Sequence, residues 1–146
     1  MQTNGHKKEV VYKGSGYAIV KSGDKLVMRF YAQNLTGFLI DGAIAQVKTT
    51  PLKVDFYTIT KSVKIIWNSA FEGMDLKNFS FEKATGIEEI YSYAFKDCKN
   101  LKWPKHGFAG CYQIADNAFE GAQIIKREET QENSEEQQNI DKQITI

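Results

Sequence analysis

Apolar side chains recur every 24 residues between positions 63 and 122 of the chain. The segments VKIIWNSAFEGM, IEEIYSYAFKDC and CYQIADNAFEGA begin at Val63, Ile87 and Cys111 and align without a gap. Five columns of this alignment are apolar in all three copies: Val63, Ile87 and Cys111; Ile66, Ile90 and Ile114; Ala70, Ala94 and Ala118; Phe71, Phe95 and Phe119; and Met74, Cys98 and Ala122. A fixed period of this length is typical of stacked repeats, because one turn cannot bury its own apolar edge and its neighbours cover it. The pattern predicts a continuous core over residues 50–125.

The stretches around these columns predict where the strands lie. Polar residues such as Lys64 and Glu88 separate the apolar columns and are expected to face water. Leu76 in LKNFSFEK and Leu101 in LKWPKHGF follow the Phe column, and Leu52 in PLKVDFY lies 24 residues before Leu76. We expect these Leu-containing stretches to be the strands, one in each turn.

The two ends of the chain do not continue the period. Residues 1–49 are predicted to form an N-terminal β-rich cap, because YAIVK and KLVMRFY flank Ser22-Gly23-Asp24 as in a β-hairpin. Asp41-Gly42 separates two more apolar runs, FLI and AIAQV, which we interpret as strands; a helix over residues 36–47 is the alternative.

Residues 126–146 are predicted to be a polar C-terminal tail, since KREETQENSEEQQN is rich in Glu and Gln. A solvated helix or a mobile tail is favoured over an interaction tail. The last residues, IDKQITI, alternate well enough for an edge strand or for docking on the open end of the repeats. With the cap and the repeats of residues 50–125, the tail completes one compact domain.

The repeat pattern I-x-x-x-A-F-x-x-C/M-x-x-L resembles the BspA-like leucine-rich repeats of bacterial and protist surface proteins. The matching positions are Ile90, Ala94, Phe95, Cys98 and Leu101, together with Ile66, Ala70, Phe71, Met74, Ile114, Ala118 and Phe119. The family's Pro occurs only once, at Pro104, and its usual Gly after the Ile is replaced by Trp67, Tyr91 and Ala115. The resemblance implies the α/β class, as a β-rich right-handed leucine-rich-repeat solenoid with the hairpin cap, used for protein binding or adhesion. It also implies a secreted or cell-surface location, although the N-terminal residues MQTNGHKKEVVYKGSG are not expected to be a signal peptide.

The charge balance narrows the possible partners. With 19 Lys and Arg against 18 Asp and Glu, the formal net charge is +1. The net charge therefore gives no reason to expect binding to nucleic acid or to an anionic membrane. No apolar stretch is long enough for a membrane span.

The sequence predicts no catalytic, metal or cofactor site, and hence no enzyme. Cys98 and Cys111 occupy apolar repeat columns, which favours buried thiols over a disulfide, although the sequence leaves a bridge open. His6 and His106 lack further ligands at metal-binding spacing. The adjacent acids at Glu88 and Glu89 are interpreted as a solvated polar face.

Two surfaces are candidates for binding a protein or glycan partner. One carries aromatic residues at outward columns, namely Trp67, Tyr91, Tyr93 and Tyr112. Exposed aromatic residues of this kind supply much of the energy of interfaces, although each could instead pack on the cap or between turns. The other is a mildly basic strand face with Lys53, Lys77 and Lys102. The alternative function is a structural, self-assembly module that forms a homo-oligomer through an uncovered end or edge.

Overall fold

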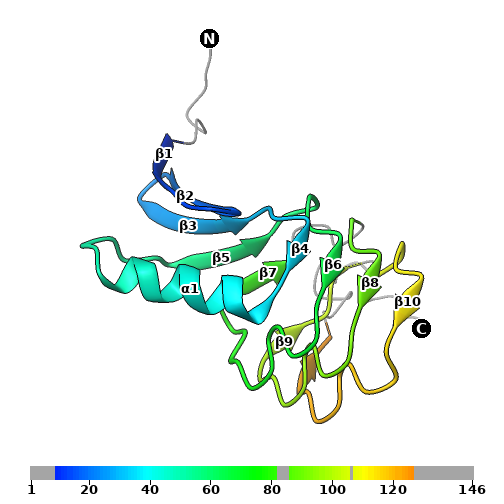
Figure 1. Cartoon of the computed structure of the whole chain (residues 1–146). Helices are drawn as coiled ribbons and strands as arrows, with labels where there is room; N and C mark the ends of the chain where they lie inside the picture. The colour runs from blue at the N-terminus through cyan, green and yellow to red at the C-terminus, as the bar shows by residue number, and fades with distance from the viewer. Residues whose placement is uncertain (1–8, 82–85, 106, 127–146) are drawn as a thin grey trace, which may run out of the picture.

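The structure, a computed structural model, describes residues 9–81, 86–105 and 107–126. A five-stranded mixed sheet lies along one side of it in the order β1-β2-β3-β5-β7 (Figure 1). The strands are β1 (Glu9–Lys13), β2 (Tyr17–Ser22), β3 (Lys25–Phe30), β5 (Phe56–Ile59) and β7 (Phe79–Phe81). The first three are antiparallel, whereas β5 is parallel to both β3 and β7. The predicted hairpin is confirmed, because Ser22 pairs with Lys25 across a turn in which Gly23 has a φ of 66°.

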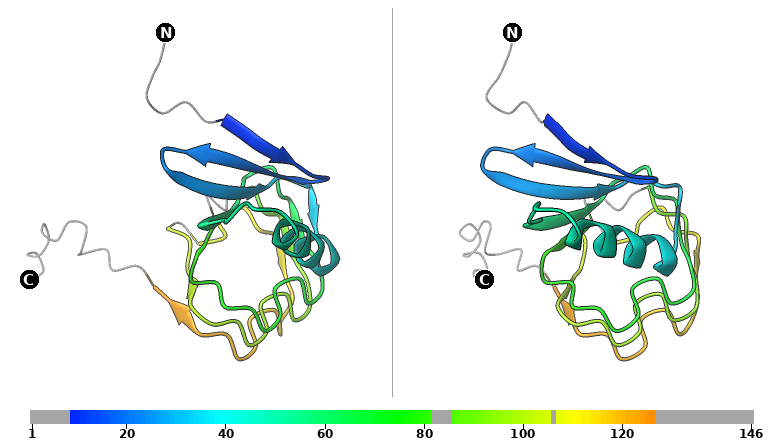
Figure 2. Two further views of the ribbon diagram at one scale, coloured as in Figure 1. Left: turned by 90° about the vertical axis from the view of Figure 1, so that its left-hand side faces the viewer. Right: turned by 60° about the vertical axis from the view of Figure 1, so that its left-hand side comes forward.

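A second sheet stacks the successive turns of the repeat. It consists of β4 (Asn34–Leu35), β6 (Ile65–Ile66), β8 (Glu89–Ile90) and β10 (Gln113–Ile114), all parallel, in the order β10-β8-β6-β4. Ile66 pairs with Ile90, and Ile90 pairs with Ile114, so residues 24 apart are neighbours in space. Seen nearly end-on, the turns lie almost on top of one another (Figure 2). The predicted stacking is confirmed.

The Phe column forms a stack through the middle of the core. The ring of Phe95 lies 5.2 Å from that of Phe71 and 5.0 Å from that of Phe119, and both pairs are nearly parallel. Main-chain hydrogen bonds between turns repeat with the same period as the rings. The Phe71 N–H donates to the Ala94 carbonyl and the Phe95 N–H to the Ala118 carbonyl, each at 2.8 Å. Phe71 and Phe95 are fully buried, which confirms this column as core.

The chain between residues 36 and 48 is a helix, so our preference for strands there was wrong and the alternative is correct. Helix α1 (Gly37–Lys48) is capped by Thr36, the residue before it, whose side-chain oxygen accepts a hydrogen bond from the Leu39 N–H at 3.1 Å. Its buried residues are Ile40, Ala43 and Val47, which share one helical face. Asp41 and Gly42, interpreted as a turn, are exposed on the helix.

The three Leu-containing stretches predicted to be strands each contain strand residues, which confirms that prediction, whereas the expectation of one strand in each turn was wrong. Only Leu101 lies in a strand, β9 (Leu101–Lys102), which pairs in parallel with β11 (Ile124–Ile125). Leu52 and Leu76 precede β5 and β7, which begin at Phe56 and Phe79. Each turn contains more than one strand, because the Ile column also forms strands. The described residues thus form mixed sheets with one helix and no closed barrel.

Candidate interaction surface

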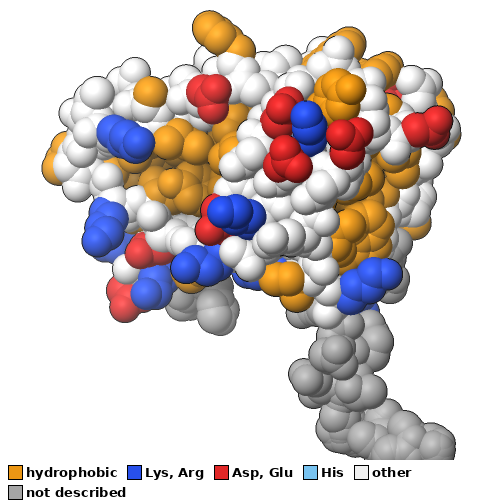
Figure 3. Space-filling view, turned by 90° about the horizontal axis from the view of Figure 1, so that it is seen from below, with side chains coloured by type: hydrophobic (Ala, Val, Ile, Leu, Met, Phe, Trp, Pro, Cys, Tyr) orange, Lys and Arg blue, Asp and Glu red, His pale blue; other side chains and the backbone are white. Residues whose placement is uncertain are grey.

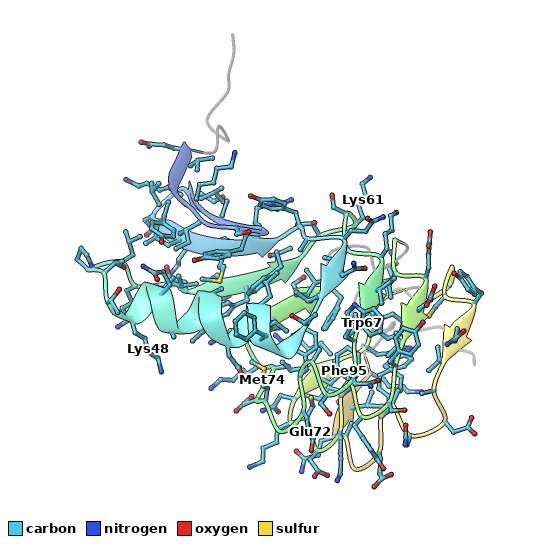
Figure 4. The ribbon with its side chains drawn as sticks, viewed as in Figure 1. Lys48, Lys61, Trp67, Glu72, Met74 and Phe95 are labelled. Carbon is cyan, nitrogen blue, oxygen red and sulfur yellow. The ribbon has the colours of Figure 1, made fainter. Side chains whose placement is uncertain are left out.

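The second sheet positions two aromatic side chains on its outer face. Ile66 and Ile90 point into the core and are fully buried, so the residues that follow them point the other way. These residues are Trp67 and Tyr91, whose rings stack with centroids 4.9 Å apart and an angle of 11° between their planes. Trp67 remains 37% exposed and lies beside β6 (Figure 4). The stack therefore presents flat aromatic area to solvent in a fixed orientation.

A carboxylate organises this surface. Glu89 accepts hydrogen bonds from the hydroxyl groups of Tyr91 and Tyr112, the latter with an O···O distance of 2.6 Å. These bonds, that from Tyr112 first, lower the pKa of Glu89 from its ordinary value because they stabilise the charged form. The same contact raises the pKa of Tyr112 to about 12. The pKa of Tyr91 is also raised, mainly by its hydrogen bond to Glu89.

Trp67, Glu89, Tyr91 and Tyr112 together form what we call the aromatic surface. Tyr112 comes from the turn after that of Glu89, and its side chain is 70% exposed. Because the hydroxyl groups donate to the carboxylate, the tyrosine rings are tied to one another across two turns. At neutral pH the surface carries one negative charge among three aromatic rings.

Tyr93 does not join this group in any contact between described residues. It lies in the turn after β8, with a φ of 57°, and its ring contacts the Lys96 ammonium, whose nitrogen lies 5.1 Å from the ring centroid. Its side chain is exposed. Three of the four aromatic residues predicted for this surface, Trp67, Tyr91 and Tyr112, therefore lie together, and Tyr93 lies apart from them.

Two of the three predicted lysines come together. The Lys102 ammonium donates a hydrogen bond to the main-chain carbonyl of Lys77 at 2.5 Å. Both residues are exposed. Lys53 is exposed between α1 and β5, and no contact between described residues links it to the other two. Side chains of both charges lie beside apolar patches on the lower face of the molecule (Figure 3).

Two residues that the structure places on the surface were not singled out from the sequence. Glu89 was interpreted as part of a solvated acidic pair. Its contact with Tyr112 could have been predicted from their spacing, because 23 residues, about one turn of the repeat, separate them. Phe38 is 91% exposed, because α1 turns it away from the buried face at Ile40 and Ala43. The helix that exposes Phe38 could have been predicted from Thr36, because Thr favours the start of a helix.

Groups that could carry chemistry are few in the described part of the chain. Cys98 and Cys111 are free thiols, the first fully buried and the second partly buried. Within the ranges 9–81, 86–105 and 107–126, no cluster of three or more His, Cys, Asp or Glu could hold a metal ion. His6 and His106 lie outside the described residues. Among the described helices, none is long and apolar enough to cross a membrane.

The last described turn exposes residues that earlier turns bury. Ile114 is 43% exposed, whereas its sister residues Ile66 and Ile90 are fully buried. Ile124 and Ile125 of β11 are exposed as well. Asn117 has a buried side-chain oxygen, Oδ1, with no hydrogen-bond partner among the described residues. We call this end of the stack, with the exposed Ile114, Ile124 and Ile125, the open end. The predicted tail and IDKQITI fall on residues 127–146, beyond Lys126 and outside the described ranges.

Parallel turns stacked through files of equivalent apolar side chains define a repeat protein. A family model described as the BspA type leucine rich repeat region matches residues 48–140 as six copies. The match spans more than half of the chain, and the chain therefore belongs to this family. Leucine-rich-repeat domains generally mediate protein interaction or adhesion, and proteins of this family are often secreted or surface-located. Neither a curated protein nor a solved structure gave a significant match to the chain.

Proposed function

We propose that this protein is a non-catalytic interaction module that binds a partner through the aromatic surface. The observation that carries the proposal is the Trp67–Tyr91 stack, which stays accessible while Glu89 fixes the tyrosine hydroxyl groups. Rings held in place before binding lose little conformational entropy when a partner docks. Aromatic residues of this kind dominate the binding energy of many interfaces.

The charge of the surface favours a protein over a glycan as the partner. The Glu89 carboxylate lies among three rings and is ionised at neutral pH, as glutamates ordinarily are, and the two hydroxyl donors lower its pKa further. A Lys or Arg side chain can pair with this carboxylate and lie over an aromatic face at the same time. A sugar can use the ring faces but brings no positive charge. We therefore expect a partner segment that contains Lys or Arg.

A peptide library displayed on phage and selected on the full chain tests this proposal. We expect selected peptides to be enriched in Lys or Arg, and Trp67→Ala or Glu89→Gln to weaken their binding by at least about tenfold. Tyr93→Ala is the matched control, because Tyr93 is an exposed tyrosine outside the aromatic surface. Binding that survives Trp67→Ala, or a selection that gives no specific peptide, contradicts the proposal. A glycan array probed in parallel tests the competing partner class.

A second candidate function is self-assembly through the open end. The exposed Ile114, Ile124 and Ile125 favour it, since an end-to-end contact would cover them. The main-chain N–H groups of Phe71 and Phe95 each donate to a carbonyl of the next turn. The N–H of Phe119 has no following turn to donate to among the described residues. Sedimentation velocity at increasing protein concentration tests this function. We expect a dimer that Ile114→Asp returns to monomer, whereas a monomer at every concentration contradicts self-assembly.

We also propose the finer architecture and location that the family suggests. The stacked turns would form a short right-handed solenoid over residues 50–125, with residues 1–49 as its N-terminal cap and 126–146 as a polar tail. The pairing of β4 with β6 and of β3 with β5 supports a cap that is continuous with the repeats. We propose a secreted or cell-surface location, which labelling of intact cells with an impermeant reagent tests.

A further inference from the structure

An apolar pocket of about 320 Å³ lies beside the first turns of α1. One wall is formed by Ser15 and Tyr17, at the turn between β1 and β2, and the other by residues of α1 that include Phe38, Leu39 and Gly42. The described residues that line the pocket carry no charge, and none of them belongs to the aromatic surface or to the open end. A pocket with such a lining accepts an apolar group better than a charged one.

The pocket is open because Gly42 has no side chain. Phe38 and Gly42 are four residues apart, so they lie on the same side of the helix. A Cβ atom at Gly42 would meet nothing within 4 Å. Helical side chains lean toward the start of their helix, so Phe38 leans away from Gly42 and leaves the space beside it free.

Hydrogen bonds hold both walls of the pocket in place. The Gly16 carbonyl, in the turn between β1 and β2, accepts the N–H groups of Tyr31 at 2.9 Å and Ala32 at 3.2 Å. On the other side, the Thr36 hydroxyl oxygen accepts the Leu39 N–H at 3.1 Å. The pocket is therefore formed before anything binds, and filling it costs little conformational entropy.

Phe38 projects from the rim of the same pocket. Its side chain is 91% exposed, which is the largest exposed fraction among the large apolar residues that the structure describes. No other described element covers the outer side of α1, which lies at the surface (Figure 2). Moving a phenyl ring from water into an apolar site is favourable by about 1.5 to 3 kcal/mol. The surface thus carries an apolar projection and an apolar pocket side by side.

A second copy of the chain satisfies both features at once. A partner that only filled the pocket would leave Phe38 in water, and one that only covered Phe38 would leave the pocket empty. In a two-fold contact the same patch of each copy meets the other, so each ring can enter the opposite pocket. We propose that two copies associate through α1, with the Phe38 ring of each inserted beside Gly42 of the other.

The size of this contact makes the association weak. Two phenyl rings bury roughly 300 to 500 Å², whereas a standard stable interface buries at least about 1,200 Å². We therefore expect a dissociation constant of about 0.1 to 1 mM. The contact uses neither the aromatic surface nor the open end, so it can fail without either of the functions proposed above, and they can fail without it.

Nuclear magnetic resonance spectra of the full chain, labelled with ¹⁵N and recorded from about 0.05 to 2 mM, test the contact. We expect the amide signals of Ser15, Leu39 and Gly42 to shift as the concentration rises, while translational diffusion slows toward that of a dimer. The shifts should persist in Ile114→Asp, because the open end takes no part. Signals that stay constant up to about 2 mM overturn the proposal.

Two variants remove the two halves of the contact separately. Phe38→Ser removes the projecting ring, and Gly42→Leu fills the pocket without disturbing the fold, because the space at Gly42 is open. We expect each variant alone to lose the concentration-dependent shifts. Phe56→Ser is the matched control, since Phe56 is an exposed Phe outside the pocket, and it should keep them. Equal losses in Phe56→Ser overturn the proposal.

Mixing the two variants tests the reciprocal insertion directly. Labelled Phe38→Ser keeps an empty pocket, and unlabelled Gly42→Leu keeps the ring that can fill it. We expect the signals of the labelled chain to shift when Gly42→Leu is added and to stay unchanged when unlabelled Phe38→Ser is added. Identical responses to both additions overturn the proposal. If N-acetyl-phenylalanine amide shifts these signals in a chain that stays monomeric at about 2 mM, the pocket takes a ring from a different partner, which also overturns it.

Discussion

The rings of Phe95 and Phe119 lie 5.0 Å apart and within 3° of parallel, yet Phe95 is fully buried and Phe119 only partly so. The difference arises because Phe95 has a turn on each side, with Phe71 stacked on its other face. Position in the stack, and not residue type, therefore sets how much each ring contributes to stability.

Truncation of the two rings should differ in cost. We expect Phe95→Ala to lower the free energy of unfolding by about 3 to 5 kcal/mol, since it leaves a cavity between two turns. Phe119→Ala should cost about half as much, because solvent already reaches that ring. Urea unfolding followed by circular dichroism measures both values. Equal losses would show that the end of the stack is as well covered as its middle.

Removing the charge of Glu89 should change the titration of Tyr112. Its hydrogen bond to Glu89 raises the pKa of Tyr112 to about 12. In Glu89→Gln the neutral amide no longer opposes formation of a phenolate, so this pKa should fall toward the ordinary value of about 10. Ultraviolet absorbance near 295 nm follows the titration, and the difference from a Tyr112→Phe variant isolates the signal. An unchanged pKa in Glu89→Gln would falsify the contact.

Burial of Cys98 should make stability fall at alkaline pH. Desolvation raises the pKa of its thiol to about 11, above the value near 9 in the unfolded chain. Between these values the unfolded state has lost the proton and the folded state still holds it, so the free energy of unfolding decreases as pH rises from about 9 to about 11. Tyrosines titrate nearby, and we therefore compare the chain with Cys98→Ala. The variant should show a shallower decline in urea unfolding over this range, and parallel profiles would argue against the effect.

Two glycines should respond in opposite ways to substitution by Ala. A Cβ atom at Gly86 would lie 2.1 Å from the main-chain oxygen of Lys61, so Gly86→Ala should cost more than about 2 kcal/mol as the turns are forced apart. Gly42 is exposed in α1 with nothing within 4 Å of such a Cβ atom, and Gly42→Ala should stabilise the helix by about 0.5 to 1 kcal/mol. Thermal unfolding of both variants measures whether each substitution lowers or raises the stability of the protein. A stable Gly86→Ala variant would mean that the first two turns are not packed this closely.

The fold was predictable where one rule repeats along the chain. The Ile and Phe columns place equivalent side chains at every twenty-fourth residue, and the structure stacks them as expected. The Leu stretches located the strands without giving their exact bounds, because the links between columns are not constant in length: Tyr57 pairs with Phe79, which is 22 residues away. A column alignment that begins at Val63 carries no information about such a link.

The aromatic surface could be predicted only in part. Trp67 and Tyr91 share a column, so the sequence alone brings them together. The bond from Tyr112 to Glu89 joins residues one position out of step with the period, and it depends on how two side chains lean across neighbouring turns.

By itself, the sequence determined that the chain winds into stacked turns, because only neighbouring turns can bury its periodic apolar columns. The tertiary structure decided the rest. It made residues 37–48 a helix, since Ile40, Ala43 and Val47 are buried together only in that conformation. It also left Trp67 and Ile114 accessible, because their exposure depends on which distant segments reach them and not on their place in the repeat.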